Sequence, residues 1–261
     1  MAPRALVRRP GPLLADGIVT HLDREPVDVD LATKQWDAYS EALMSNGWDL
    51  IPVPPADDCP DAVFVEDAVV VFHMLDSFRD LAVITRPGAD ARKPETGGLE
   101  PIVTGQRYSV EHIVEPGTLD GGDVLKVGSV VYVGRGGRTN GEGIRQLRAI
   151  LEPHGMLVVA VPVTKVLHLK SAVTALPDGT VIGYEPLVDD DRIFDRFRPV
   201  PEESGSHVVD LGGGRLLMAA DAPRSAELFR DLGYEPVTVD ISEFQKLEGC
   251  VTCLSVRLRR P

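Results

Sequence analysis

The sequence repeats one local pattern five times, and this recurrence limits the folds open to the chain more than any single motif does. Each repeat is an apolar segment, a tight turn of glycine or polar residues, and a second apolar segment, which is the pattern of a β-hairpin. Glycines supply the positive backbone angles of the turns, as at Gly128 and Gly213. The segments are FVEDAVVVFHMLDSFRDLAVITR, GGDVLKVGSVVYVG, HLKSAVTALPDGTVIGY, SHVVDLGGGRLLMAAD and CVTCLSVRLR, the last with the N-terminal RALVRR as a candidate partner.

Helical patterns lie between the hairpins. Three intervals show the apolar spacing of an amphipathic helix, namely residues 30–46, 139–154 and 222–232. Residues 91–107 and 187–198 show that spacing more weakly. Five hairpin-plus-helix units favour a radially repeated α/β architecture over a Rossmann sheet, and no GxGxxG or P-loop motif opens a helix. No linker-like stretch divides the chain, so we expect one domain spanning residues 1–261.

Charge and composition restrict the partners of the chain. With 261 residues, 43% hydrophobic and 26% charged, the sequence is typical of a globular enzyme. The formal net charge of -13 repels phosphate and anionic lipid, which disfavours nucleic acid and membrane as partners. Prolines interrupt the basic N-terminus before a signal-peptide core forms, and no apolar run is long enough to span a membrane. A sparse, odd set of three cysteines suits the reducing cytoplasm.

Polar and reactive side chains recur where the apolar strands begin. If the units close radially, these strand starts converge at a shared centre. Burying a carboxylate costs several kcal/mol unless it is paired, so acids gathered there imply a cationic partner. A single Asp in such a position is more often a turn cap, but recurrence in successive units favours a site. The residues are Asp61, Glu66, Asp67, Asp120, Asp123, His168, Lys170 and Cys253.

Two arginines and the cysteines complete this inventory. Arg86 and Arg138 offer planar forks that suit a carboxylate, although either could be an ordinary surface arginine. Cys with His suits covalent chemistry, whereas paired thiols in an apolar run are more often inert core residues. Cys250 and Cys253 have zinc-like spacing, but on a β-strand they would point to opposite faces, and no second pair completes four ligands. An amino acid with a cationic side chain matches the inventory better than a metal or, with 5% aromatic residues, a sugar.

Five motifs together resemble those of the dimethylarginine dimethylaminohydrolases: PDAVFVED, TLDGGDV, GGRTNGEG, LHLKS and SEFQKLEGCVTCLS. The resemblance covers nearly the whole chain in order. It implies the five-bladed pseudo-symmetric α/β propeller of the guanidine-modifying superfamily, the pentein fold, with ββαβ-type units around a central active site. It also implies hydrolysis of Nω-methylated L-arginine to L-citrulline and dimethylamine or methylamine, with no organic cofactor and no metal.

The resemblance also implies roles for individual residues. The nucleophile falls on Cys253 and not on Cys250, which we expect to be a packing cysteine, and His168 matches the general acid and base. Asp67 and Asp120 match the carboxylates that hold the guanidinium. Further substrate contacts are implied at Glu66, at Arg86 and Arg138 for the α-carboxylate, and at Asp61, Ile18 and Leu247 for the α-amino group.

Several alternatives stay open at this point. Related enzymes act on free arginine or agmatine, although Arg86 and Arg138 favour a substrate with an α-carboxylate, and amidinotransferases resemble longer chains. A binder of basic amino acids without activity is a different class, against which Cys253 and His168 together argue. We also expect the carboxylates to raise the pKa of Cys253, so that the thiol is protonated in the empty site. The sequence decides neither a homodimer nor whether residues 13–20 close over the pocket.

Overall fold

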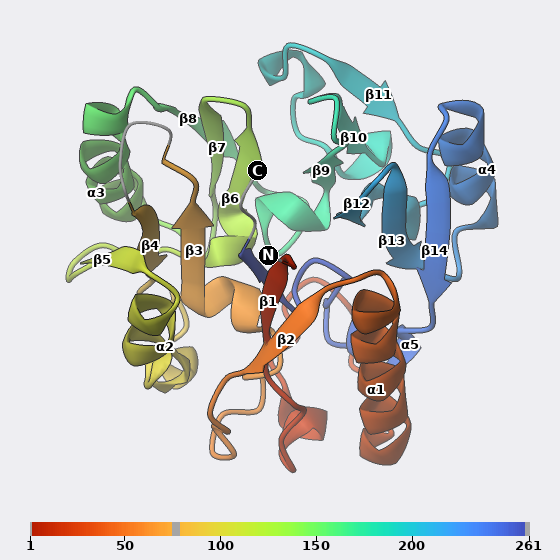
Figure 1. Cartoon of the computed structure of the whole chain (residues 1–261), viewed down its shortest axis with the longest axis horizontal. Coiled ribbons are helices and arrows are strands. Elements are labelled where there is room, and N and C mark those ends of the chain that lie inside the picture. The colour runs from red at the N-terminus through yellow and green to blue at the C-terminus, as the bar shows by residue number, and fades with distance from the viewer. Residues whose placement is uncertain (1, 75–78, 259–261) are drawn as a thin grey trace.

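The strands of the protein form five three-stranded sheets around a common centre (Figure 1). The computed structural model describes residues 2–74 and 79–258. The sheets are β15 (Val256–Leu258), β1 (Arg4–Val7) and β2 (Asp49–Pro52); β3 (Val69–Phe72), β4 (Asp80–Ile84) and β5 (Tyr108–His112); β6 (Val124–Val127), β7 (Val130–Arg135) and β8 (Leu157–Pro162); β9 (Val173–Ala175), β10 (Val181–Gly183) and β11 (Phe197–Pro199); and β12 (Val208–Gly212), β13 (Arg215–Ala219) and β14 (Glu235–Val239).

The pairing of the strands is the same in all five sheets. The middle strand runs antiparallel to its inner neighbour and parallel to its outer one. This repetition confirms the predicted five-bladed α/β propeller and its hairpins. Arg4 pairs with Leu258, so strands from near both chain ends complete the fifth blade, as the RALVRR segment predicts. The first hairpin's turn, at 75–78, and the end of the last segment, at 259, lie outside the described residues.

The α-helices confirm three of the predicted intervals. The helices are α1 (Val29–Ser45), α2 (Leu99–Gly105), α3 (Gly141–Leu151), α4 (Pro223–Asp231) and α5 (Ser242–Gln245). The side chains of Asp28 and Asn140 accept hydrogen bonds from backbone amides of the first turns of α1 and α3, which satisfies donors that a helix leaves free. The weaker pattern at 91–107 contains the 3₁₀ helix η3 (Asp90–Thr96) followed by α2.

The second weak pattern, at 187–198, does not form an α-helix. The chain there makes the short 3₁₀ helices η7 (Glu185–Leu187) and η8 (Asp191–Ile193) and then enters β11. The Asp190 side chain accepts from the backbone amide of Arg192 and also binds its guanidinium. Such local side-chain bonds compete with helical backbone bonds and favour a turn.

A 3₁₀ turn precedes the inner strand of four blades. These turns are η2 (Val65–Ala68), η4 (Gly121–Asp123), η6 (Leu169–Ser171) and η9 (Ser204–Ser206). The other short helices, η1 (Leu14–Asp16) and η5 (Glu152–His154), lie elsewhere. Because the inner strands surround the centre, η2, η4 and η6 bring their polar residues together there (Figure 1).

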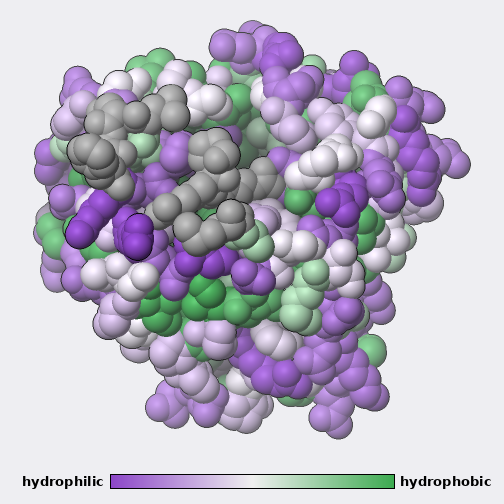
Figure 2. All heavy atoms as spheres, in the orientation of Figure 1, coloured by the Kyte–Doolittle hydropathy of each residue, from purple (hydrophilic) through white to green (hydrophobic). Residues whose placement is uncertain are grey.

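Apolar side chains fill the spaces between neighbouring blades. One core cluster joins Val83 of β4, Val133 of β7 and Leu147 of α3, all of them fully buried. Hydrophilic residues dominate the rim of the face in Figure 2, as the charge of the sequence leads one to expect. None of the helices in the described residues is long and apolar enough to cross a membrane.

Candidate active site

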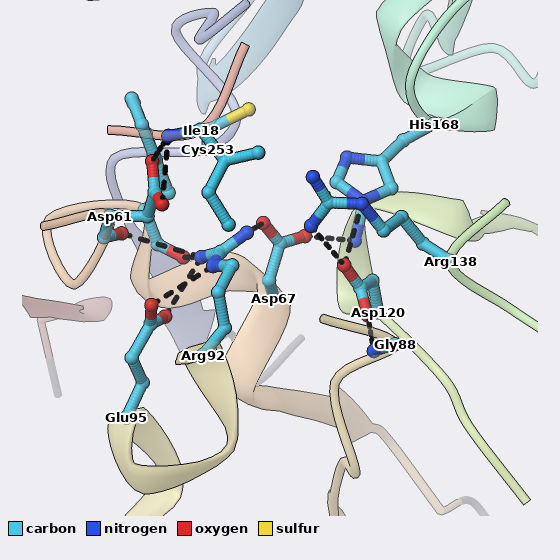
Figure 3. Close-up of polar contacts among 12 residues, drawn as sticks. Ile18, Asp61, Asp67, Gly88, Arg92, Glu95, Asp120, Arg138, His168 and Cys253 are labelled. Carbon is cyan, nitrogen blue, oxygen red and sulfur yellow. Dashed lines mark hydrogen bonds and ion pairs between the residues drawn. The ribbon is translucent and has the colours of Figure 1, made fainter. Parts of the chain in front are cut away.

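A small buried pocket lies on one side of the propeller centre. Its volume is about 10 Å³, close to the space that one water molecule occupies. Several residues that the sequence nominated line it together: Ile18, Asp61, Asp67, Arg138, His168, Leu247 and Cys253. Asp120 lies beneath it, bonded to His168 (Figure 3). The convergence of η2, η4, η6 and the C-terminal segment therefore builds one site from distant parts of the sequence.

Asp67 sits in η2 and its carboxylate is held from two sides. One oxygen accepts from the amide of Gly122 at 2.7 Å, and the other accepts from the guanidinium of Arg92 at 2.7 Å. Burial acts to raise the pKa of Asp67, but the positive charges of His168 and Arg92 outweigh it and hold that pKa well below its usual value. Asp67 is therefore a fixed anion on the floor of the pocket.

His168 precedes η6 and lies between two carboxylates. Its Nε2 is 2.9 Å from Asp120 Oδ2, and its Nδ1 is 4.0 Å from Asp67 Oδ1. Burial alone would lower the pKa of His168, but the charge of Asp67 and the hydrogen bond with Asp120 raise it to about 9. The ring is therefore an imidazolium at neutral pH, in which both nitrogens are donors. Asp123 supports this geometry by accepting from the amide of Leu169, the residue after His168, at 2.9 Å.

Arg138 lines the pocket next to Asp120, which lies beneath it. Asp120 accepts from the amide of Gly88 at 2.8 Å, and Arg138 Nη1 lies 3.8 Å from Asp120 Oδ2. Gly88 has to be glycine, because a Cβ there would stand 2.2 Å from the Arg138 carbonyl oxygen. Nη1 of Arg138 is buried without a hydrogen-bond partner in the structure. A buried cationic donor of this kind is suited to an anionic group of a ligand.

The loop of residues 17–21 covers the pocket. Both carboxylate oxygens of Asp61 accept from the amide of Ile18 at 3.1 Å. Glu248, whose φ is 61°, accepts from the amides of Thr20 and His21 at 2.7 and 2.8 Å. These backbone contacts answer the question of closure that the sequence left open, because they hold the loop over the site. A substrate larger than the present pocket volume of about 10 Å³ would have to displace part of its lining.

Cys253 differs from the expectation in its local structure. The prediction that Cys250 and Cys253 lie on a strand and point to opposite faces is wrong, because residues 251–254 form a turn in which the Cys253 amide donates to the Cys250 carbonyl at 3.1 Å. The two Sγ atoms are 3.2 Å apart. The hydrogen bond with Cys250 and then burial, more than the carboxylates, raise the pKa of Cys253 well above its ordinary value. The direction agrees with the prediction, and Cys250 supplies its largest cause.

Two nominated residues lie outside this pocket. Glu66 is next to Asp67 in η2, but consecutive residues of a 3₁₀ turn point in different directions. Its carboxylate binds Lys170 at 2.6 Å and Arg257 at 2.9 Å, and all three line a separate central cavity of about 450 Å³. Arg86 donates to the carbonyl of Gly117 at 3.2 Å instead of lining the pocket. Substrate contacts by Glu66 and Arg86 therefore stay predictions.

Arg92 is the site residue that sequence reasoning missed. It is fully buried and donates to Asp67, to both carboxylate oxygens of Glu95, and to the Asp61 and Phe64 carbonyls (Figure 3). It lies in the interval 91–107, where the helical pattern was weak. The signal that could have revealed it is the pair of charges at Arg92 and Glu95, three positions apart on the short η3 helix.

Asp67, Asp120 and His168 also present ligand atoms within 4.8 Å of one another, which is the one such grouping among the described residues that could hold a metal ion. Backbone amides of Gly122 and Gly88 and the guanidinium of Arg92 already donate to the two carboxylates. The arrangement thus suits a cation that itself donates hydrogen bonds, such as a guanidinium. A reaction without metal stays a prediction.

Comparison with curated proteins places the chain among named relatives. It is 68% identical over 256 residues to the N(G),N(G)-dimethylarginine dimethylaminohydrolase of Streptomyces coelicolor, covering 98% of this chain and 97% of that protein. It is 37% identical over 263 residues to the protein of the same name from Pseudomonas aeruginosa, covering 98% and 100%. No protein-family model matches the chain.

Solved structures agree with these relatives. The Pseudomonas aeruginosa enzyme complexed with citrulline is similar with a TM-score of 0.87 and 35% identity, covering 98% of this chain and 99% of that one. A dimethylarginine dimethylaminohydrolase adduct with S-methyl-L-thiocitrulline gives 0.88 at 35% identity, covering 98% and 100%. The N-terminal domain of ArgZ, a cyanobacterial arginine dihydrolase, gives 0.82 at 19% identity, with 99% of both chains covered, which supports the fold alone. The chain belongs to the dimethylarginine dimethylaminohydrolase family, as the sequence motifs predict.

Proposed function

We propose that this chain hydrolyses Nω-methylated L-arginine to L-citrulline and dimethylamine or methylamine through a covalent intermediate on Cys253. One observation carries the proposal: a thiol, an imidazolium and two fixed carboxylates surround a single buried pocket. Family membership at 68% identity, and a relative crystallised with citrulline, support the same reaction. The substrate is a small-molecule guanidine.

The carboxylates fix the substrate. A guanidinium is a poor electrophile because its charge is delocalised, so it has to be held with its central carbon facing the thiol. Asp67 is kept anionic by Arg92 and His168 and retains lone pairs for a charge-assisted bond. Asp120 would contact the other side of the guanidinium while also orienting the ring of His168.

Cys253 and His168 then carry out the bond-making and bond-breaking steps. The sulfur attacks the guanidinium carbon, and His168, already protonated at neutral pH, donates its proton to the departing amine. The C–N bond breaks and a thiouronium remains on Cys253. The neutral imidazole next removes a proton from water, the resulting hydroxide adds to the same carbon, and the C–S bond breaks to release citrulline. His168 is thereby an acid in the first step and a base in the second.

The resting thiol has to lose its proton when the substrate binds. Because the pKa of Cys253 is raised in the empty site, the arriving cation supplies the charge that favours the thiolate, and the thiol proton leaves to solvent, since His168 already carries its own proton. Alkylation of Cys253 by iodoacetamide at pH 7 should therefore be slow in the empty enzyme and faster with bound acetamidinium, a small unreactive amidine. A faster rate in the empty enzyme would contradict this order of events.

The remaining contacts would recognise the amino-acid end of the substrate. The buried Nη1 of Arg138, which makes no hydrogen bond, is suited to the α-carboxylate. Arg86 would join it only by leaving the Gly117 carbonyl. The Asp61 carboxylate and the backbone carbonyls of Ile18 and Leu247 would receive the α-amino group, with Asp61 exchanging its present bonds to the Ile18 amide. Glu66 would act indirectly, by fixing the position of η2 and so of Asp67 beside it.

The test is formation of the ureido product, which is citrulline from the arginine substrates and a carbamoylated diamine from agmatine, measured by a colorimetric assay. Asymmetric dimethylarginine, monomethylarginine, arginine and agmatine would be supplied to the wild type, Cys253→Ser and the control Cys59→Ser. We expect citrulline from the methylated substrates with the wild type and Cys59→Ser, and a loss of at least about 1000-fold in kcat with Cys253→Ser. Greater turnover of arginine would favour a deiminase, and tight binding of all ligands without turnover would favour a non-catalytic binder.

Three further properties belong to the proposal. The chain would act as one domain over residues 1–261, in the cytoplasm, where three free cysteines stay reduced. The oligomeric state stays open between a monomer and a homodimer. Nucleic acid and membrane would not bind a chain with a net charge of -13. Light scattering on the purified protein decides between monomer and dimer.

A further inference from the structure

Cys250 stands in contact with the proposed nucleophile, and the mechanism above gives it no task. Its Sγ is 3.2 Å from Cys253 Sγ and 3.2 Å from Thr252 Oγ1. Both cysteines are at least nine-tenths buried, at 3% and 7% relative exposure. A packing role alone does not require the two sulfurs to meet.

The backbone geometry of the turn suits a bond between these sulfurs. The hydrogen bond from the Cys253 amide to the Cys250 carbonyl, at 3.1 Å, closes a turn of four residues. The ends of such a turn are less than about 7 Å apart at Cα, which overlaps the range of about 4.4–6.8 Å found in disulfides. The Sγ atoms would have to approach from 3.2 Å to about 2 Å, a side-chain movement of about 1 Å.

We propose that Cys250 and Cys253 form a site of reversible oxidation, in which hydrogen peroxide oxidises Cys253 and Cys250 then closes a disulfide onto it. In the first step Cys253 Sγ attacks a peroxide oxygen, the S–O bond forms and the O–O bond breaks. The thiol proton leaves with the second oxygen as water, so Cys253 becomes a sulfenic acid. In the second step the Cys250 thiolate attacks Cys253 Sγ, the S–S bond forms, and the S–O bond breaks to release hydroxide. Two electrons pass from the sulfurs to the peroxide, and a dithiol reductant reverses the change by exchange.

The order of the two steps follows from position. Cys253 lines the pocket, whose volume of about 10 Å³ admits a molecule near the size of water, whereas Cys250 lies behind it and does not line the pocket. The hydrogen bond from Cys253 lowers the pKa of Cys250, against burial and with help from the charge of His207, to about 5. This hydrogen bond belongs to the reduced pair and ends when the Cys253 thiol is oxidised, so the second step rests on distance: Cys250 Sγ already lies 3.2 Å from the sulfur that peroxide reaches first.

The experiment uses the full chain and follows mass as well as activity. Wild type, Cys250→Ser and the control Cys59→Ser would be treated with hydrogen peroxide, quenched in acid and digested with trypsin. Both cysteines fall in one tryptic peptide, residues 247–257, because cleavage follows Lys246 and Arg257. We expect this peptide to lose about 2 Da in the wild type and in Cys59→Ser, and dithiothreitol to restore the mass and nearly all citrulline production. In Cys250→Ser the peptide should instead gain oxygen atoms, with less than about one-tenth of the lost activity recovered.

Two results would overturn the proposal. One is a wild-type peptide that gains oxygen without ever losing two hydrogens. The other is recovery by dithiothreitol that is as complete in Cys250→Ser as in the wild type. The mass change needs no substrate, so it would be observed even if the proposed hydrolysis were wrong, whereas the activity arm rests on that function. Cys59 is buried elsewhere in the fold and reports general thiol damage.

Discussion

Two buried clusters of charge meet at the centre of this propeller, and they are built from the same 3₁₀ turns. Asp67 of η2 and His168 before η6 face the small pocket, while Glu66 of η2 and Lys170 of η6 face the large central cavity. The two cavities share no lining residue in the described part of the chain. A difference of one residue, between Glu66 and Asp67, or of two, between His168 and Lys170, thus decides which cavity a side chain faces.

The clusters differ in what neutralises them. Glu66 has two internal cations, Lys170 at 2.6 Å and Arg257 at 2.9 Å, which balance its charge without a ligand, although both bind Oε1 and the buried Oε2 has no hydrogen-bond partner. The pocket carboxylates receive much of their support from backbone amides, and the buried Nη1 of Arg138 lies 3.8 Å from Asp120 without making a hydrogen bond. A cluster closed by its own cations stabilises a fold, whereas a cluster with open donors and acceptors suits a ligand. Mutations on the two sides should therefore have different consequences.

The largest effect is expected from Asp67→Asn. The substitution keeps the size of the side chain and removes the charge that would hold the substrate guanidinium. We expect kcat/KM for dimethylarginine to fall about 1000-fold, by analogy with the loss of a preorganised charge-stabilising group. Steady-state citrulline assays measure it, with circular dichroism as the check that the variant is folded. A loss of less than ten-fold would remove Asp67 from the proposed mechanism.

Lys170→Met should act on stability. It removes one of the two cations bound to Glu66 and leaves a buried carboxylate with Arg257 only. Breaking a buried ion pair from one side costs about 4 kcal/mol, which urea unfolding would report as a lower free energy of unfolding. The double variant Glu66→Gln with Lys170→Met should recover part of that loss. If Lys170→Met instead abolished turnover at full stability, the two clusters would not be separate in function.

The sequence predicts the charged hub at the centre, but not its division into two clusters that face different cavities. Residue types at the strand starts predict a hub of acids, His168 and Cys253, because each recurs at one point of a repeated unit. They do not predict that Glu66 and Asp67 face different cavities, because a 3₁₀ turn was not distinguishable from the start of a strand. The buried role of Arg92 and the contact of Cys250 with Cys253 depend on tertiary packing and on a turn, which apolar periodicity does not encode.

His168 should make the stability of the protein depend on pH. Its pKa is about 6.5 when unfolded and about 9 when folded, so the folded state binds the proton more tightly. The stabilisation is fully present below pH 6.5 and is lost as the pH rises to 9, on the order of 3 kcal/mol in total. Urea unfolding at intervals from pH 6 to 9.5 measures it. The variant His168→Asn should show a flatter profile, and an equal slope in both proteins would assign the effect to other groups.

The smallest effect is expected at the loop over the pocket. Glu248 holds this loop through the amides of Thr20 and His21 at 2.7 and 2.8 Å. Glu248→Gln retains the backbone conformation and one acceptor oxygen but loses the charge, which weakens the loop contacts by about 1 kcal/mol. The open population should rise about five-fold, since 1.4 kcal/mol corresponds to a factor of ten.

Alkylation of Cys253 in the empty enzyme measures that opening, because Cys253 lines the pocket and a reagent larger than its volume of about 10 Å³ should reach the thiol faster when the loop is displaced. We expect the rate to increase about five-fold in Glu248→Gln, and to stay unchanged in the control Glu41→Gln, whose side chain is exposed on α1. An unchanged rate in Glu248→Gln would mean that Asp61 and Ile18 alone hold the loop closed. Closure on the substrate side would then depend on the same carboxylate that is proposed to receive the α-amino group, which couples binding directly to opening.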